Sequence, residues 1–552
     1  MASMSVPEIQ EFSSLAERVI DELLASDPGL ANGAGDHRFD DRLPDLSADG
    51  VAARVAKLRD ASNALSGADS EALSPGQRVD HEQLLSLVER ALFGLTEVRD
   101  HEWNPLAHNP GALLHALIAR PYAPVAQRLE SLAGRLAAVP DALDTARVVL
   151  RASPRIHEET AAGQFRGTAA LVRHEVPALL EDVPGLASLV QPVADSAVAA
   201  LEQFAAWLQA CAAGAEEGRD PRLGRRLWEA KLWHTLDTEL SAAEVLRRAR
   251  ENLERVTEDI REESAALVGG RADDDTVRTA LNRLADDHPT NDSIVELARQ
   301  SLDETTAFVA RNEIVSLVDD PCVIQEMPEF ARGVAVAYCD APGPLETADV
   351  PTFYCIAPTP ADWSPERVES FYREYNNHMV RNLSVHEAMP GHFLQLAHSR
   401  RYAGSTRARA VARSGTFIEG WAVYAEEAMV AHGFGGPAVR LQQLKMQLRM
   451  TINAILDQLT HCEGMTEGEA MALMTQRGFQ EDGEAAGKWR RALLTSCQLS
   501  TYFVGYTEVA AIAARRPIDV SSRTWHDAML GQGSLSPRHL ARLLPPAEPR
   551  SR

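Results

Sequence analysis

The sequence predicts a mostly α-helical protein with one small β-sheet near residues 321–358. Residues 8–215 follow a helical apolar period almost throughout, and Ala and Leu dominate there. Short β-branched or aromatic runs, separated by Pro and Gly, lie between Pro321 and Pro358. With 552 residues the chain can bury a large core, and its length allows two to four domains.

The composition argues against several classes of protein. A formal net charge of −24 argues against a nucleic-acid surface or an anionic membrane face. The start, residues 6–30, has the spacing of an amphipathic helix and not of a signal peptide, and no apolar run approaches a membrane span. Six cysteines without a CxxC pair fit a reducing compartment. We therefore expect a cytoplasmic protein that binds neither nucleic acid nor membrane; the oligomeric state stays unknown.

Turns interrupt the N-terminal helical region at four places that contain Pro or Gly. They are residues 29–35, 104–111, 139–140 and 183–185. Directly after the first turn comes an acidic and aromatic stretch, residues 36–45. It is either an ordered loop or a solvated charged loop.

A domain boundary is predicted in the run 217–224, which is charged and contains Gly and Pro. This gives an N-terminal helical domain, residues 1–220, and a catalytic helical domain, residues 221–552. Soon after the boundary, Ser241 and Glu244 have the spacing of a capping box. Apolar residues then recur on one face until Gly269, which predicts a long helix that packs on the catalytic half.

The predicted sheet consists of segments 322–324, 333–338 and 352–356. Its edge either pairs with an extended peptide substrate or belongs to a hairpin with a structural role alone. Tyr354 could contact substrate, although an aromatic residue in a sheet needs no such role. A helix beginning at Ser364 and Pro365 then leads into the most informative stretch of the chain.

That stretch contains His386, Glu387 and His392. Two neutral imidazoles and a carboxylate are common ligands of a hydrolytic zinc ion, and a glutamate beside the first histidine can accept a proton from water. On a regular helix a six-residue interval would place the two rings about 120° apart. Pro390 and Gly391 predict an interrupted helix that brings the rings together. Alternatively, the Pro-Gly pair ends one helix and His392 simply starts the next.

A third ligand should come from the later helical segment 416–427, and Glu419 is the preferred candidate. It and Glu426 are seven residues apart and share an otherwise apolar face. An acidic side chain on such a face is costly to bury unless it is paired or binds a metal. Glu426 is interpreted either as the acceptor for a ligand histidine N–H or as a surface ion pair.

A second group of residues, around His101, has part of the same metal-binding pattern. Five His-Glu dipeptides occur, so the dipeptide alone carries little information. His101-Glu102 is also followed by a histidine, His108. The residues between them predict a loop, and no carboxylate-bearing helix recommends that pair as a metal site.

These residues resemble the bacterial family catalogued as domain of unknown function 885. The likeness lies in His386-Glu387-x-x-Pro390-Gly391-His392, in Phe417-x-Glu419-Gly420-Trp421, and in the later blocks Gln498-x-x-x-Tyr502-x-x-Gly505 and Trp525-His526. More distantly, the chain is similar to the thimet oligopeptidase and M32-type carboxypeptidase groups. That resemblance implies a two-lobed helical metallopeptidase-like fold around a deep cleft. Tyr502, which matches the family's Gln-to-Tyr block, is the candidate oxyanion donor or else a buried tyrosine with a satisfied hydroxyl. Tyr506 and His526 are the next candidates for that role.

The sequence thus predicts a zinc-dependent hydrolase, holding one divalent ion, that cleaves a small peptide or peptide-like amide with Glu387 as general base. One alternative is a metal-dependent enzyme acting on a non-peptide substrate by ester hydrolysis or lyase chemistry. Another is a catalytically silent binding protein of the same fold. The arginines between the two motif helices are either solvated or include one that binds a peptide carboxylate: Arg400, Arg401, Arg407, Arg409 and Arg413.

Overall fold

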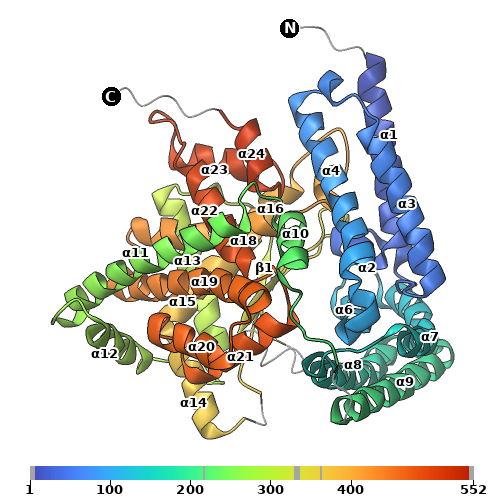
Figure 1. The fold of residues 1–552 in the computed structure, drawn as a ribbon, viewed down its shortest axis with the longest axis horizontal. Coiled ribbons are helices and arrows are strands. Elements are labelled where there is room, and N and C mark those ends of the chain that lie inside the picture. The colour runs from blue at the N-terminus through green and yellow to red at the C-terminus, as the bar shows by residue number, and fades with distance from the viewer. Residues whose placement is uncertain (1–5, 215–217, 328–335, 361–362, 546–552) are drawn as a thin grey trace. The chain divides into compact units, whose positions relative to one another are not determined.

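The computed structural model describes residues 6–214, 218–327, 336–360 and 363–545, and it confirms the mostly helical class with one small sheet (Figure 1). The chain divides into two compact units. Unit 1 contains residues 1–221, 342–350 and 404–412, and unit 2 contains the remainder. The two short segments of unit 1 come from the C-terminal half, so the division is not a single cut in the sequence. Residue 217 of the predicted boundary run lies outside the described residues.

Unit 1 begins with four helices that share one core, and Figure 1 shows α1, α3 and α4 as long neighbours. Ser47 and Ser74 cap α3 and α4 by accepting N–H groups of the first turn, which satisfies donors that a helix end leaves free. The remaining helices of the unit are α5 to α9 and the short α17. The bounds are α1 Val6–Ser26, α2 Pro28–Ala34, α3 Ala48–Ser66, α4 Pro75–Phe93, α5 Asp100–Trp103, α6 Gly111–Ala119, α7 Val125–Val149, α8 Arg155–Asp182, α9 Ala187–Ala213 and α17 Ala408–Val411.

Helices α7, α8 and α9 pack on one another around a second apolar core of unit 1. Phe165 and Phe204 meet edge to face there, with ring centroids 4.8 Å apart. The turn predicted at residues 139–140 is wrong, because Pro140 lies inside α7. Leu136 and Leu143 on either side of it are fully buried, so packing of the apolar face outweighs the one backbone hydrogen bond that proline removes.

The stretch 36–45 is an ordered loop, the first of the two interpretations above. His37 lies between two carboxylates, with Nδ1 2.7 Å from Asp40 and Nε2 2.7 Å from Glu346. The Tyr122 ring stacks on its imidazole at 3.6 Å, and the Tyr122 hydroxyl donates to Asp40. Arg135, which is fully buried, donates to the other oxygen of Asp40. The loop is charged in composition, and its central carboxylate is buried, since Asp40 is 3% exposed.

Unit 2 is built around α19, which is buried along most of its length and contacts α11, α15, α18, α21 and α22. The predicted long helix is α11, capped by Ser241, and it lies beside α19 in Figure 1. The bounds are α10 Arg225–Leu236, α11 Ala242–Val268, α12 Asp274–Ala285, α13 Ile294–Asn312, α14 Pro365–Glu374, α15 Asn377–Glu387, α16 His392–Arg400, α18 Gly415–Ala431, α19 Gly436–Glu463, α20 Glu467–Ala472, α21 Asp482–Leu494, α22 Ser500–Ala513, α23 Ser522–Leu530 and α24 Pro537–Leu543.

The small sheet of unit 2 has three strands, β1 Cys322–Glu326, β2 Ala337–Asp340 and β3 Thr352–Ile356, in the order β1-β3-β2. β1 pairs with β3 in parallel, and β2 pairs with β3 antiparallel. Among the described strands, β2 therefore lies at an edge of the sheet. The predicted segment 333–338 extends into this strand, although residues 333–335 lie outside the described part of the chain.

No described helix combines the length and the apolar character that crossing a bilayer requires.

Candidate metal site

The helix that carries His386 is interrupted at the predicted point. α15 ends at Glu387 and α16 begins at His392. Between them, the Gly391 N–H donates to the Val385 carbonyl at 2.9 Å, which folds the chain back on itself. The two imidazole rings come together, with centroids 4.7 Å apart and planes at 86°. His392 thus starts a new helix, as the alternative interpretation held, and still meets His386.

Close approach of the backbone requires Gly391, whose φ of −69° is not in the left-handed region. A Cβ atom on it would lie 1.9 Å from the His386 carbonyl oxygen. Any side chain there would push the two helix ends apart. On the other side of the interruption, the Trp421 indole N–H donates to the Pro390 carbonyl at 2.8 Å and ties it to α18.

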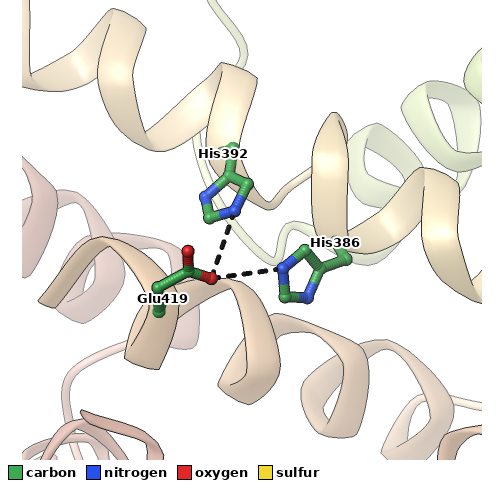
Figure 2. Close-up of side chains that lie close together, drawn as sticks. All are labelled: His386, His392 and Glu419. Carbon is green, nitrogen blue, oxygen red and sulfur yellow. Dashed lines mark ion pairs between the residues drawn. The ribbon is translucent and has the colours of Figure 1, made fainter. Parts of the chain in front are cut away.

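His386, His392 and Glu419 converge from three helices, α15, α16 and α18 (Figure 2). The Glu419 Oε2 atom lies 3.5 Å from Nε2 of His386 and 3.5 Å from Nε2 of His392. One ligand atom from each residue can be chosen so that all lie within 4.8 Å of one another. Figure 2 shows both rings pointing toward this carboxylate oxygen.

The donor set fits a divalent metal ion. Glu419 Oε2 is buried without a hydrogen-bond partner, and 3.5 Å is too long for a normal N–H···O bond. In a tetrahedral zinc site with bonds of about 2.0–2.1 Å, neighbouring ligand atoms are roughly 3.3 Å apart. The two separations from Glu419 are close to that spacing, and the ligand types are those of catalytic zinc sites.

Glu426 fixes the orientation of His386. Its Oε1 lies 2.7 Å from Nδ1 of His386, and its Oε2 accepts a hydrogen bond from the Asn382 side-chain amide at 2.6 Å. Glu426 is 1% exposed, so it is no surface ion pair. An acceptor at Nδ1 places the histidine proton there and leaves Nε2 free to ligate. Asn382 is one helical turn before His386 and was not singled out from the sequence.

Glu387 lies beside this group and is 8% exposed. The backbone N–H of Cys339, on edge strand β2, donates to its carboxylate. Burial raises the pKa of Glu387, and the nearby His392 and His386 only partly oppose that rise. A glutamate of raised pKa is a better proton acceptor near neutral pH.

The other groups are strongly coupled to one another. Burial alone would raise the pKa of Glu419, but the two facing imidazoles hold that pKa far below its usual range. Burial would lower the pKa of His386, but Glu419 and Glu426 raise it well above the ordinary value. Three carboxylates thus surround two imidazoles, and the excess negative charge favours a cation at their meeting point.

A glycine contact brings Tyr502 toward this group. A Cβ on Gly420 of α18 would lie 2.3 Å from the backbone of Gly505 on α22. A Cβ on Gly505 would lie 2.1 Å from the Thr416 carbonyl oxygen. The two backbones therefore touch one residue after Glu419 and three residues after Tyr502. Both glycines belong to the motifs found in the sequence, but the sequence alone did not indicate that the two helices touch there.

Tyr502 is partly buried, and its hydroxyl accepts hydrogen bonds from Arg491 and Gln498, each at 3.4 Å. Two donors on the oxygen leave its own O–H free to donate to a substrate. Burial raises the pKa of Tyr502, and the Glu419 charge raises it further. The hydroxyl therefore stays protonated near neutral pH.

The remaining three candidates are engaged elsewhere. The Tyr506 hydroxyl donates to Glu427 at 2.6 Å. Both His526 nitrogens are occupied, Nδ1 by the Ile314 carbonyl and Nε2 by the Tyr424 hydroxyl. Neither is available as an oxyanion donor in this arrangement. Tyr354 is fully buried and contacts the Ser384 hydroxyl at 3.2 Å, so its hydroxyl has a partner within unit 2.

The second group, around His101, forms an internal contact of unit 1. His108 Nε2 lies 2.7 Å from the His101 carbonyl oxygen, and burial lowers the pKa of both imidazoles. His108 is thereby held by a backbone carbonyl. Within the described residues, the one His, Cys and carboxylate group with ligand atoms close enough for a metal is that of His386, His392 and Glu419.

Fold and site together define a mostly helical protein with a candidate two-histidine, one-glutamate metal site. The chain belongs to the family described as "Bacterial protein of unknown function (DUF885)", whose model matches residues 28–544. No curated protein matches the chain.

Solved structures resemble it over nearly its whole length. A "putative lipoprotein of unknown function" from Shewanella oneidensis is 28% identical, with a TM-score of 0.80, over 97% of this chain and 99% of that one. A "putative lipoprotein" from Colwellia psychrerythraea is 16% identical, with a TM-score of 0.78, over 98% of each chain. An M32 carboxypeptidase from Deinococcus radiodurans R1 is 11% identical, with a TM-score of 0.34, over 97% and 89%.

Proposed function

We propose that this protein is a zinc-dependent hydrolase of peptide or peptide-like amide bonds, with His386, His392 and Glu419 as ligands. The observation that carries the proposal is the convergence of these three side chains from three helices, with ligand atoms within 4.8 Å, beside a buried Glu387. A bound zinc ion would lower the pKa of a water molecule toward neutrality and polarise the substrate carbonyl.

The chain's own residues supply the proton transfers. Glu387 accepts a proton from the attacking water on its carboxylate and returns it to the leaving amine. The Cys339 N–H orients the carboxylate from β2. The free O–H of Tyr502 donates to the oxygen on which negative charge develops. Because β2 lies at an edge of the described sheet, an extended peptide next to Glu387 could add to this strand.

Elemental analysis of the purified protein, followed by turnover of a mixed peptide library, tests the proposal. We expect one zinc per chain, and peptide cleavage that a chelator abolishes and zinc restores. Glu387→Gln should keep stoichiometric zinc and lose cleavage by a factor of roughly a thousand or more. Unchanged turnover in that variant would remove Glu387 from the mechanism, and a protein that binds no zinc would overturn the proposal as a whole.

A further inference from the structure

A buried cluster of charges lies in unit 2, next to Tyr502, and carries more positive than negative charge. Its members come from α14, α19 and α21. The carboxylates are Glu374 and Glu484, and the cations are Lys445, Arg449, Lys488 and Arg491. Three of the four cations are less than a tenth exposed: Lys445 6%, Arg449 9% and Lys488 7%. Buried charges are costly unless they are paired, so the pairing of each member matters.

Two of the cations use both carboxylates. Lys445 Nζ donates to Glu374 at 2.8 Å. Arg449 forms a close ion pair with Glu484 and also contacts the Tyr375 hydroxyl at 3.3 Å. These contacts account for the negative charge of the cluster.

The other two cations, both on α21, have no carboxylate partner among the described residues. Arg491 hydrogen bonds to the neutral Gln498 and Tyr502 side chains. In the described part of the chain, the Lys488 ammonium makes no hydrogen bond or ion pair. Burial lowers its pKa well below the ordinary value, and the charges of Arg449 and Arg491 lower it further. Arg491 is three positions after Lys488, so the two lie on one face of the helix.

Arg491 connects this pair to the candidate active site through Tyr502. Arg491 donates to the Tyr502 hydroxyl, and the charge of Glu419 reaches the same hydroxyl. In contrast, three of the arginines considered from the sequence are already paired: Arg401 with Asp320, Arg407 with Glu17, and Arg409 with Asp80. None of those three is free to bind a substrate anion.

We propose that Lys488 and Arg491 form a subsite that binds a carboxylate of the substrate on the Tyr502 side of the active site. The position of the subsite within an active site rests on the proposed function, whereas anion binding itself does not. A carboxylate between them would supply the missing countercharge and accept charge-assisted hydrogen bonds from both side chains. The protein would then select peptides with a free C-terminal carboxylate or with an acidic side chain.

Isothermal titration of the zinc-loaded Glu387→Gln variant, which cannot turn substrate over, tests this subsite. The probes are N-acetyl-trialanine and its C-terminal amide, together with N-acetyl-Ala-Glu-Ala amide and N-acetyl-Ala-Gln-Ala amide. Hydrogen bonds to charged groups are worth about 1.5–3 kcal/mol, so we expect one carboxylate probe to bind about tenfold or more tightly than its neutral partner. The first pair reports a C-terminal carboxylate, and the second reports an acidic side chain.

Lys488→Met and Arg491→Met, each added to Glu387→Gln, should abolish that preference. Arg490→Met is the matched control, because Arg490 is an exposed neighbour on the same helix, and the preference should survive there. Lys488→Met removes a buried amine that has no partner among the described residues, so the variant should fold and melt at an unchanged or higher temperature. Equal affinity for the charged and neutral probes, no binding of either, or a preference that survives both variants would overturn the subsite.

A further experiment distinguishes a failure of this subsite from a failure of the proposed function. Zinc can itself bind a carboxylate, so the titrations are repeated with the metal-free His392→Ala variant. A preference that persists there and disappears in Lys488→Met supports the subsite even if no peptide is hydrolysed. A preference that requires zinc and ignores Lys488 overturns the subsite and leaves the hydrolase proposal intact.

Discussion

Two histidines of this protein, His37 in unit 1 and His386 in unit 2, each lie between two carboxylates but differ in one distance. His37 is 2.7 Å from both Asp40 and Glu346. His386 is 2.7 Å from Glu426 on one side and 3.5 Å from Glu419 on the other. The first imidazole is held by two close contacts, and the second keeps one nitrogen at a distance that suits a shared ion.

The second difference is a further imidazole. Glu419 faces both His386 and His392, whereas Asp40 faces an arginine and a tyrosine. Arg135 balances the charge at Asp40 inside the protein, and the corresponding charge at Glu419 is left for histidine protons or for a metal ion. The other contacts of the two carboxylates therefore decide whether a histidine between them has a structural role or is a candidate metal ligand.

The largest expected difference between the two sites is in metal content. His392→Ala should lose zinc and reduce peptide turnover by roughly a thousandfold or more, because it removes a ligand. His37→Ala should keep one zinc per chain, with turnover within about twofold of the wild type. Metal analysis after dialysis and library turnover measure both. Loss of zinc from the His37 variant would contradict the assignment of a purely structural role to His37.

The next effect concerns stability. Asp40→Asn should destabilise the protein by about 3–5 kcal/mol, because it leaves the fully buried Arg135 without its countercharge. Asp41→Asn is the control, since Asp41 is 60% exposed and should change stability by no more than about 0.5 kcal/mol. Urea unfolding measures both, and zinc content should be unchanged. Equal stability of the two variants would contradict a structural role for Asp40.

A smaller effect is expected from the acceptor behind His386. Glu426→Gln should weaken zinc binding by about 10- to 100-fold, because the ligand imidazole loses its charged partner. The neighbouring Glu427→Gln is the matched control, since Glu427 contacts Tyr506 and not His386. Competition with a chelator of known zinc affinity distinguishes them. The same loss in both variants would mean that the effect is general and not specific to His386.

The smallest effect is a pH dependence at His37. Hydrogen bonds to Asp40 and Glu346 outweigh burial and raise the pKa of His37. Its stabilising contribution is therefore complete below the unfolded pKa of about 6.5 and is lost as pH rises through the higher folded pKa. The wild type should lose more thermal stability than His37→Gln as pH rises above about 6.5. If the melting temperatures of the two proteins fall equally over that pH range, His37 does not form the two ion pairs.

Much of the site was predictable because its residues are close in sequence or share a helix face. Pro390 and Gly391 predicted the interruption between the two histidines, and the seven-residue interval joined Glu419 to Glu426. The engagement of His526 with Tyr424 and Ile314 was not predictable, since it depends on contacts between distant segments. For the same reason the sequence pointed to the arginines at 400–413, whereas Lys488 and Arg491, which have no carboxylate partner among the described residues, lie on α21.

The backbones of α18 and α22 come together at Gly420 and Gly505, one residue after Glu419 and three residues after Tyr502. A single added methyl group at either glycine would meet backbone atoms of the other helix, so one helix would have to move against the other. An alanine at either position is therefore expected to displace both the carboxylate and the hydroxyl, although it changes neither side chain.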